Sequence, residues 1–495
     1  MDELKLYREN INGRYNVLSK GMEDLFMSEN KRKERPEERK AVLGMSLLVL
    51  VLSVGVLMAG ILVLKLSPHI PILVCTFIMV IYGLYLGIPW AEMMSKAMES
   101  IASSLEAIII VMTIGMVVGS WVACGTVPYV IWGGLKLFTP AFLLPFTVVL
   151  CAVMSTLTGS SWTTVGTVGV AFLGIGVSMG IPAPVVVGAI CCGAFFGDTQ
   201  SPMSDGCNFA TAISGAGLYN GVKGMLCTNC PALLISFIVY IIIGLRYSVS
   251  ANVSSGEQIA ETLAGLEQGF HMTPAVLLPA IVLFILLAVK LPAIPTMILA
   301  AVSGVVVDVF CQKDSLADAL GYLMNGYVGN TGVADVDRII TRGGMNNMMS
   351  TVALMIFSMW MAGVLQRVGI ISVLLEKISK MVTKIVPLVS LTNILTFVFS
   401  YFAADPYLAM TLPSKALEGA YDDLELNRSV LCRSVGNAVL FAPMVPWGSG
   451  GLYVSATLGI AVSSYIPYYF MGYLAPLLCI LFAAVGIGNY KVNKD

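Results

Sequence analysis

The stretch from Gly197 to Ala210, GDTQSPMSDGCNFA, places two carboxylates, Asp198 and Asp205, inside one of the most apolar regions of the chain. An aspartate at the centre of a bilayer costs about 2.5 to 3.5 kcal/mol on insertion scales, so two in one segment need partners. Pro202 removes a backbone donor and disfavours a helical conformation of Ser201. The sequence therefore predicts a transmembrane helix that is interrupted next to this proline.

The whole chain has the composition of an integral membrane protein. Of its 495 residues, 57% are hydrophobic and only 12% are charged. Many apolar runs approach the roughly 18 residues that a membrane-spanning helix needs. We predict an all-α polytopic membrane protein whose first partner is the lipid bilayer. A net charge of −1 gives no reason to expect nucleic acid as a partner.

The distribution of polar segments divides the chain into five parts. These are a cytoplasmic N-terminal tail (1–40), a first membrane half (41–245), a polar connector (246–272), a second membrane half (273–488) and a short polar C-terminus (489–495). The tail ends in KRKERPEERK beside the first apolar run. By the positive-inside rule this predicts a cytoplasmic N-terminus, with the chain in the plasma (inner) membrane.

A polar cluster interrupts the apolar character of the first half. The residues from Thr158 to Thr164, TGSSWTT, lie between two apolar arms within 141–180. Such a polar tip is typical of a re-entrant hairpin, which tolerates membrane depth only when protein or a water-filled cavity surrounds it. A plain loop at the membrane surface is the alternative. The interrupted helix, over 184–215, follows this hairpin.

The same order of elements returns in the second half. A hairpin is predicted over 386–416, with the polar tip FAADPY, and a proline-broken helix over 430–458 contains VLFAPMVPWGSGG. A short amphipathic element is expected near 374–384. Asp405 is the only acid on the second tip, and an exposed turn aspartate before proline is the alternative interpretation. Two matched units of this kind are typical of an inverted-repeat carrier with its site at the midplane.

The residue types argue against an enzyme. The chain carries no nucleotide-binding loop and no Ser/His/Asp set with a histidine in its interior, and both histidines stand at the edges of apolar runs. Cys227 and Cys230 have metal-ligand spacing but lack a second ligand pair, so packing is favoured. We expect no cofactor beyond transported ions. Asp308 ends an apolar run shortly before Lys313, and either an interfacial or an ion-binding role fits it.

Three blocks of the sequence resemble the NhaC-type Na⁺/H⁺ antiporters: SSWTTVGTVGVAFLGIG, FFGDTQSPMSDGCNFA and FAADPYLAMTLPSKALEGAY. The resemblance covers roughly 41–488 and implies an inverted-repeat ion transporter. The motif GD-x-x-SP-x-SD of that family falls on Gly197, Asp198, Ser201, Pro202, Ser204 and Asp205, with Asn208 following. Its hairpin motif falls on Ser161, Trp162, Thr163, Thr164 and Gly166, and its late PW and PY elements fall on Pro446, Trp447, Pro467 and Tyr468.

The resemblance implies alternating-access antiport, in which Asp198 and Asp205, with Asp405 as a candidate third acid, bind Na⁺ when ionised and H⁺ when protonated. Burial disfavours a charged carboxylate and a bound Na⁺ favours it, so the two ions exclude each other. Neutral oxygens that replace the hydration shell of the ion are expected from Ser160, Ser161, Thr163, Thr164, Ser201, Ser204 and Asn208.

Two departures from the family pattern leave the cargo open. The family usually has a lysine after the GD, where this chain has Thr199. Many members also carry an acidic pair upstream of the late PW, where this chain has Val435, Gly436 and Asn437. The alternative is therefore a Na⁺- or H⁺-coupled exchanger of a small organic acid or amino acid on the same fold. Whether the carrier is a homodimer also stays open.

Overall fold

The computed structural model describes residue 39 and residues 41–251, 255–289, 291–370, 373 and 384–488. Apart from residues 39 and 384, the N-terminal tail, the amphipathic element expected near 374–384 and the C-terminus from 489 lie outside the described residues. Within these ranges all regular elements are helices, and ten of them are long and apolar enough to cross a membrane, or up to twelve if each bent pair is one span. The predicted all-α polytopic membrane fold is thereby confirmed.

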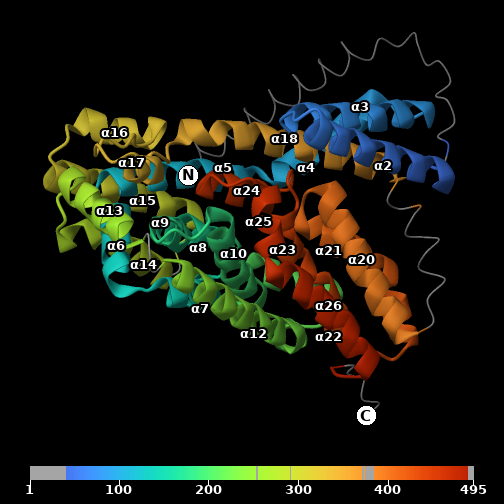
Figure 1. The fold of residues 1–495 in the computed structure, drawn as a ribbon. Coiled ribbons are helices and arrows are strands. Elements are labelled where there is room, and N and C mark those ends of the chain that lie inside the picture. The colour runs from blue at the N-terminus through green and yellow to red at the C-terminus, as the bar shows by residue number, and fades with distance from the viewer. Residues whose placement is uncertain are drawn as a thin grey trace, which may run out of the picture.

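The first helices form one side of the molecule together with α18 (Met345–Val368) (Figure 1). They are α2 (Leu43–Met58), η1 (Ala59–Val63), α3 (His69–Tyr85), α4 (Trp90–Ser103) and α5 (Leu105–Ala123). The long α18 packs against α3, α4 and α5. On α4, Glu92 forms an ion pair with Arg367 of α18, which fixes the amphipathic helix to its neighbour.

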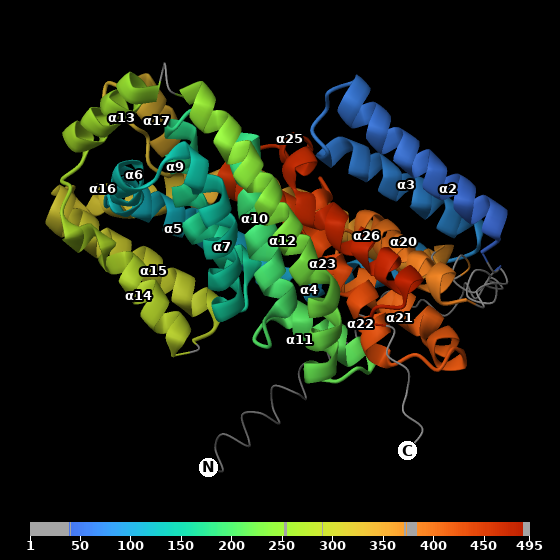
Figure 2. The same cartoon turned by 60° about the horizontal axis from the view of Figure 1, so that its bottom comes forward.

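A second group of helices gathers at the opposite end of the molecule from α2 and α3 (Figure 2). It contains α6 (Thr126–Leu137), α13 (Ser255–Gly269), η3 (Pro274–Leu277), α14 (Leu278–Ala288), α15 (Ala293–Val307), η4 (Asp308–Gln312), α16 (Leu316–Asn325) and α17 (Ala334–Ile340). The polar connector is largely helical, because α13 is amphipathic and lays one face on α6 and α17. Glu267 of α13 accepts a hydrogen bond of 2.6 Å from the indole of Trp132 on α6.

Two units lie between these groups of helices, and each consists of a hairpin followed by a broken helix. The first comprises α7 (Pro140–Thr158), α8 (Ser161–Thr164), η2 (Val165–Gly169), α9 (Val170–Ser178), α10 (Ala183–Gln200) and α11 (Asp205–Ser214). The second comprises α20 (Ile385–Ala403), α21 (Pro406–Asp423), α22 (Arg428–Val435), α23 (Asn437–Phe441), η5 (Ala442–Met444) and α24 (Ser449–Leu458). In both units, two apolar arms joined at a tip are followed by a helix that is interrupted.

Each unit is followed by apolar helices that join the two. The first leads into α12 (Leu218–Ala251), and the second into α25 (Val462–Tyr465), η6 (Ile466–Tyr468) and α26 (Phe470–Val485). The helix α12 packs against both α7 and α26, and α10 packs against α7, α12 and α23 (Figure 2). The two broken helices thus lie against each other in the middle of the molecule.

Both hairpin tips are built in the same way. The first arm ends at Gly159 with a left-handed φ of 69°, and the side chain of Ser160 then caps the next helix by accepting from the backbone of Thr163 at 3.1 Å. The second arm ends at Ala404 with a φ of 55°, and Asp405 caps α21 by accepting from the backbone of Leu408 at 2.9 Å. A left-handed residue followed by a capping side chain ends one helix and starts the next.

The first helix interruption lies at Pro202, as the sequence predicts. Helix α10 ends at Gln200 and α11 begins at Asp205. The break is closed locally, because the amide of Asn208 donates to the carbonyl of Pro202 at 3.0 Å. The second broken helix is interrupted between η5 and α24, at residues 445–448.

Close packing of α7 on α10 sets the position of the first break. A Cβ atom added at Gly197 would lie 2.6 Å from Cβ of Ser155 and 2.7 Å from the carbonyl oxygen of Ala152, closer than real contacts allow. The hydroxyl of Ser155 also donates to the carbonyl of Ala194 at 2.6 Å. Asp198 follows Gly197 directly, so this contact fixes its place on the bundle.

We predict that Gly197→Ala lowers the free energy of unfolding by about 1–3 kcal/mol, because the added methyl group overpacks the contact between α7 and α10. Gly133→Ala on α6 is the matched control, since nothing lies within 4 Å of a Cβ atom there. That substitution is expected to be neutral or stabilising, as alanine favours helix over glycine. Reversible unfolding in mixed detergent measures both, and equal stability of the two variants would contradict the packing argument.

Candidate functional site

Asp198 is the centre of the candidate site. Its Oδ2 atom accepts a hydrogen bond of 2.5 Å from the hydroxyl of Ser161, and its Oδ1 atom accepts one from the hydroxyl of Ser204. Both serines are fully buried, whereas Asp198 is partly buried. In the described part of the chain, no lysine, arginine or histidine forms an ion pair with Asp198. When Asp198 is ionised, hydroxyl groups therefore solvate its charge, and no basic side chain among the described residues neutralises it.

The two serines come from different segments of the first unit. Ser161 begins α8 at the hairpin tip, and Ser204 is the residue that caps α11 after the break. Gly159 of the tip also lies against the break, since a Cβ atom added there would be 2.7 Å from the carbonyl carbon of Met203. The hairpin tip and the break thus meet at the Asp198 carboxylate.

Asp205 lies in a different environment from Asp198. It is the first residue of α11, and its side chain is exposed. The expectation that both acids are buried is therefore wrong for Asp205. The first turn of a helix favours a carboxylate, because its free backbone N–H groups carry partial positive charge. The two acids remain close enough for their charges to interact.

The other predicted oxygen ligands stabilise the tip and the break and do not contact Asp198. Thr163 donates to the hydroxyl of Ser160 at 3.2 Å, and Thr164 donates to the carbonyl of Ser160 at 3.1 Å. At the break, Ser201 accepts from the backbone of Met203 at 3.2 Å. Of the predicted neutral ligands, the structure brings only Ser161 and Ser204 to the carboxylate of Asp198.

Tyr407 connects the second hairpin with the candidate site. Its ring meets the ring of Phe209 on α11 edge to face, with centroids 5.1 Å apart. Four carboxylates act electrostatically on its hydroxyl group, namely those of Asp198, Asp205, Asp405 and Glu106. Asp405 is partly buried and uses one oxygen to cap α21. The sequence analysis did not identify Tyr407, although its place directly after Asp405 and Pro406 on the polar tip could have pointed to it.

Aromatic contacts tie each tip to the second broken helix. The indole of Trp162 stacks on the ring of Tyr453 with centroids 4.4 Å apart, and the Tyr453 hydroxyl donates to the carbonyl of Trp162 at 2.5 Å. In the second unit the indole of Trp447 donates to the carbonyl of Tyr401 at 2.8 Å. The first tip is thus held by α24 of the other half.

A neutral polar network replaces the lysine expected after Asp198. The hydroxyl of Thr199 accepts from the side-chain amides of Gln200 at 3.0 Å and Asn229 at 3.2 Å. Gln200 Oε1 is buried without a hydrogen-bond partner in the described residues. Asn229 belongs to α12 and lies between Cys227 and Cys230, so the motif that had metal-ligand spacing supplies an amide to this network. Among the described residues no three His, Cys, Asp or Glu side chains could hold a metal ion together.

The apolar bundle, its two hairpins and its two interrupted helices define a multi-pass membrane transport protein. Residues 193–487 match the sequence model of the Na⁺/H⁺ antiporter family. The chain belongs to the Na⁺/H⁺ antiporter family, which confirms the resemblance drawn from its motifs.

Relatives of the chain span different exchange activities. The chain is 33% identical over 456 residues to the Na⁺/H⁺ antiporter NhaC of Alkalihalophilus pseudofirmus, covering 92% of this chain and 98% of the relative. It is 32% identical over 446 residues to a malate-2H⁺/Na⁺-lactate antiporter of Bacillus subtilis, covering 89% and 95%. It is also 32% identical over 466 residues to the arginine/ornithine antiporter ArcD of Halobacterium salinarum, covering 93% and 95%.

We predict that Tyr453→Phe lowers the free energy of unfolding by about 0.5–1.5 kcal/mol, because it removes the hydrogen bond to the Trp162 carbonyl and keeps the ring stack. Tyr219→Phe is the control, since Tyr219 is 86% exposed. Thermal unfolding of the purified protein measures both. A loss of stability no greater than that of the control would show that this hydroxyl does not hold the tip.

Proposed function

We propose that the chain is a Na⁺/H⁺ antiporter of the plasma membrane with a cytoplasmic N-terminus, and that Na⁺ and H⁺ compete for Asp198. One observation carries the proposal. A carboxylate lies at a helix break inside an apolar bundle with two hydroxyl donors and, among the described residues, no basic partner. Such a group keeps an affinity for a positive ion, because burial of an uncompensated charge is costly.

The chemistry of the site suits a small hard cation. Na⁺ prefers oxygen ligands, and the Asp198 carboxylate with the hydroxyl oxygens of Ser161 and Ser204 offers three side chains of that type. A serine hydroxyl that donates a hydrogen bond to the carboxylate still has lone pairs on its oxygen that can bind the ion. When a proton binds Asp198 instead, the site becomes neutral and loses its attraction for Na⁺. Occupancy by one ion or the other is then the coupling.

The arrangement of the two units supports alternating access. Ser161 and Ser204 come from the tip and the break of one unit, whereas Trp162 of the same tip packs on Tyr453 of the other. A shift of one unit against the other would therefore change access to Asp198 and the aromatic contact together. Asp205, exposed at the start of α11, would attract cations toward the site, and Asp405 would add to the negative potential from the second tip.

We predict that Asp198→Asn lowers Na⁺-dependent proton movement in proteoliposomes by about a hundredfold or more, because loss of a charge-assisted interaction of about 3 kcal/mol corresponds to that factor. Asp205→Asn should cost about tenfold or less, since Asp205 is exposed and acts at longer range. Asp423→Asn, at an exposed position in α21, is the control. Wild-type exchange by Asp198→Asn would overturn the proposal.

The second candidate is a Na⁺- or H⁺-coupled exchanger of a small organic acid or amino acid. The neutral network of Thr199, Gln200 and Asn229 favours it, because the buried Oε1 atom of Gln200 is an acceptor without a partner in the described residues. Two relatives also support this candidate, because one is named as a malate-2H⁺/Na⁺-lactate antiporter and the other as an arginine/ornithine antiporter.

Flux measurements separate the two candidates. Proteoliposomes loaded with Na⁺ alone are compared with proteoliposomes that also contain labelled malate, lactate, arginine or ornithine. Ion exchange at full rate without any organic solute is expected for the Na⁺/H⁺ antiporter. Exchange that requires one of these solutes on the opposite side of the membrane would establish the second candidate instead.

A further inference from the structure

Asp308 is a buried acid outside the site described above. It is the first residue of the π-type turn η4, which continues α15, and its side chain is only 1% exposed. Lys313 ends this turn in a left-handed conformation, with a φ of 72°. The carboxyl group therefore lies inside the protein, close to the end of a membrane-spanning helix.

Neither carboxyl oxygen of Asp308 has a hydrogen-bond partner among the described residues. Within the same ranges no basic side chain forms an ion pair with it. The two neighbouring acids differ from it in this respect. Asp314 accepts from the hydroxyl of Tyr322 at 3.1 Å, and Asp318 accepts from the hydroxyl of Ser315 at 2.6 Å. Asp308 is thus the one acid of the three that combines full burial with unused oxygens.

The charged groups that act on Asp308 are acids. Three basic residues also lie at this corner, namely Lys313 at the end of η4, His271 beside Gln312 and Arg342 paired through its backbone with Tyr327, and among the described residues none of them forms an ion pair with Asp308. The carboxylates of Asp314 and Asp318 act on it electrostatically. The elements packed against η4 add the thiol of Cys124 at the end of α5 and the hydroxyls of Tyr322 on α16 and Tyr327 in the following loop, while η4 itself contributes Cys311. The turn η3 also packs there and contains no titratable side chain.

These surroundings make an ionised Asp308 unfavourable. Burial of an unpaired charge without hydrogen-bond donors is unfavourable, and the two nearby carboxylates add repulsion. Tyr327, which lies outside the membrane spans, is affected by the same carboxylates. Its pKa is raised to about 12, first by burial and then by the charges of Asp314, Asp308 and Asp337. A bound proton removes the charge and needs no cage of ligands.

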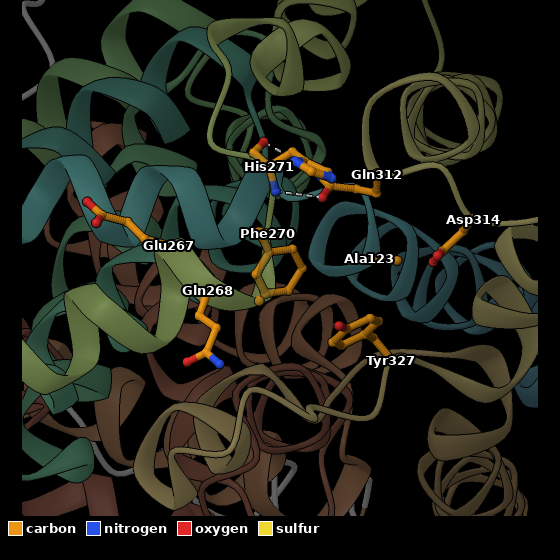
Figure 3. A pocket seen from close by; sticks show the side chains of 9 residues that line it. Ala123, Glu267, Gln268, Phe270, His271, Gln312, Asp314 and Tyr327 are labelled. Carbon is orange, nitrogen blue, oxygen red and sulfur yellow. Dashed lines mark hydrogen bonds between the residues drawn. The ribbon is translucent and has the colours of Figure 1, made fainter.

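A cavity of about 190 Å³ lies beside this region, and Gln312 of the same π-type turn lines it, although Asp308 does not. Figure 3 shows Asp314 and Tyr327 on one side of it and Glu267 and Gln268 on the other. Gln312, on the same π-type turn as Asp308, closes one end by accepting from the backbone N–H of His271 at 2.9 Å (Figure 3). Two of the residues that line the cavity, Asp314 and Tyr327, are electrostatically coupled to Asp308.

We propose that Asp308 is a second proton-binding site of this protein, separate from the transport site at Asp198, and that it exchanges its proton through the cavity between α13, η4 and Tyr327. Loss of that proton places a charge opposite Asp314 and Asp318 at the start of α16. Ionisation therefore loosens the corner where α16 packs on α5. The site makes this end of the molecule sensitive to alkaline pH.

Infrared difference spectroscopy of the full-length protein in liposomes tests the proposal directly, without any transport measurement. Asp198 and other acids also give carbonyl bands when they are protonated, so the test follows the band component that wild type shows and Asp308→Asn lacks. This component should disappear as the pH rises. It should persist in Asp198→Asn, which separates this result from the proposed transport site. Asp314→Asn removes a like charge, so the band should then disappear at lower pH. Identical spectra for wild type and Asp308→Asn would overturn the proposal.

Thermal stability provides an independent test. A group that is neutral in the folded protein and ionised in the unfolded chain contributes stability at low pH, and that stability is lost as pH rises. The neutral, isosteric Asp308→Asn should therefore match wild type at low pH and exceed it at high pH. A variant that is destabilised by the same amount at every pH would show that Asp308 has a structural hydrogen bond instead, and would overturn the proposal.

Discussion

The rest of this structure depends on the hydrogen bonds that hold the partly buried Asp198 carboxylate inside an apolar bundle. Asp198 receives hydroxyl donors from the hairpin tip, through Ser161, and from the helix break, through Ser204. These donors lower the cost of burying the charge but do not neutralise it. The tip and the break are needed together, since each supplies one of the two hydroxyl groups. The site therefore explains why irregular backbone is kept in the middle of an apolar chain.

The surrounding packing holds this irregular backbone in place. Gly197 allows α10 to approach α7 closely, and Trp162 of the tip packs on Tyr453 of the other half. Gly115 of α5 likewise allows a close approach, because the backbone N–H of Gly344 donates to its carbonyl at 2.6 Å. Small residues thus let a loop approach α5 as closely as another helix would.

The features that could be predicted from the sequence are those set by local chemistry. Pro202 predicted the break, and the small hydroxylated cluster ending at Thr164 predicted the first tip. The exposure of Asp205 could not be predicted, because it depends on where α11 lies relative to its neighbours. Tyr407 and the amide of Asn229 reach the site from helices distant in the sequence, and hydrophobic periodicity carries no information about such contacts. The helical character of the connector was missed because its polar composition suggested a surface segment.

Proton release on Na⁺ binding tests the central claim most directly. Purified protein in weakly buffered detergent solution is titrated with NaCl, with choline chloride as the ionic-strength control, and the pH is followed with an indicator dye. If Na⁺ and H⁺ share Asp198, Na⁺ displaces protons from the wild type and the release disappears in Asp198→Asn. Equal proton release by the two proteins, or Na⁺ binding to the wild type without release, would contradict competition at this carboxylate.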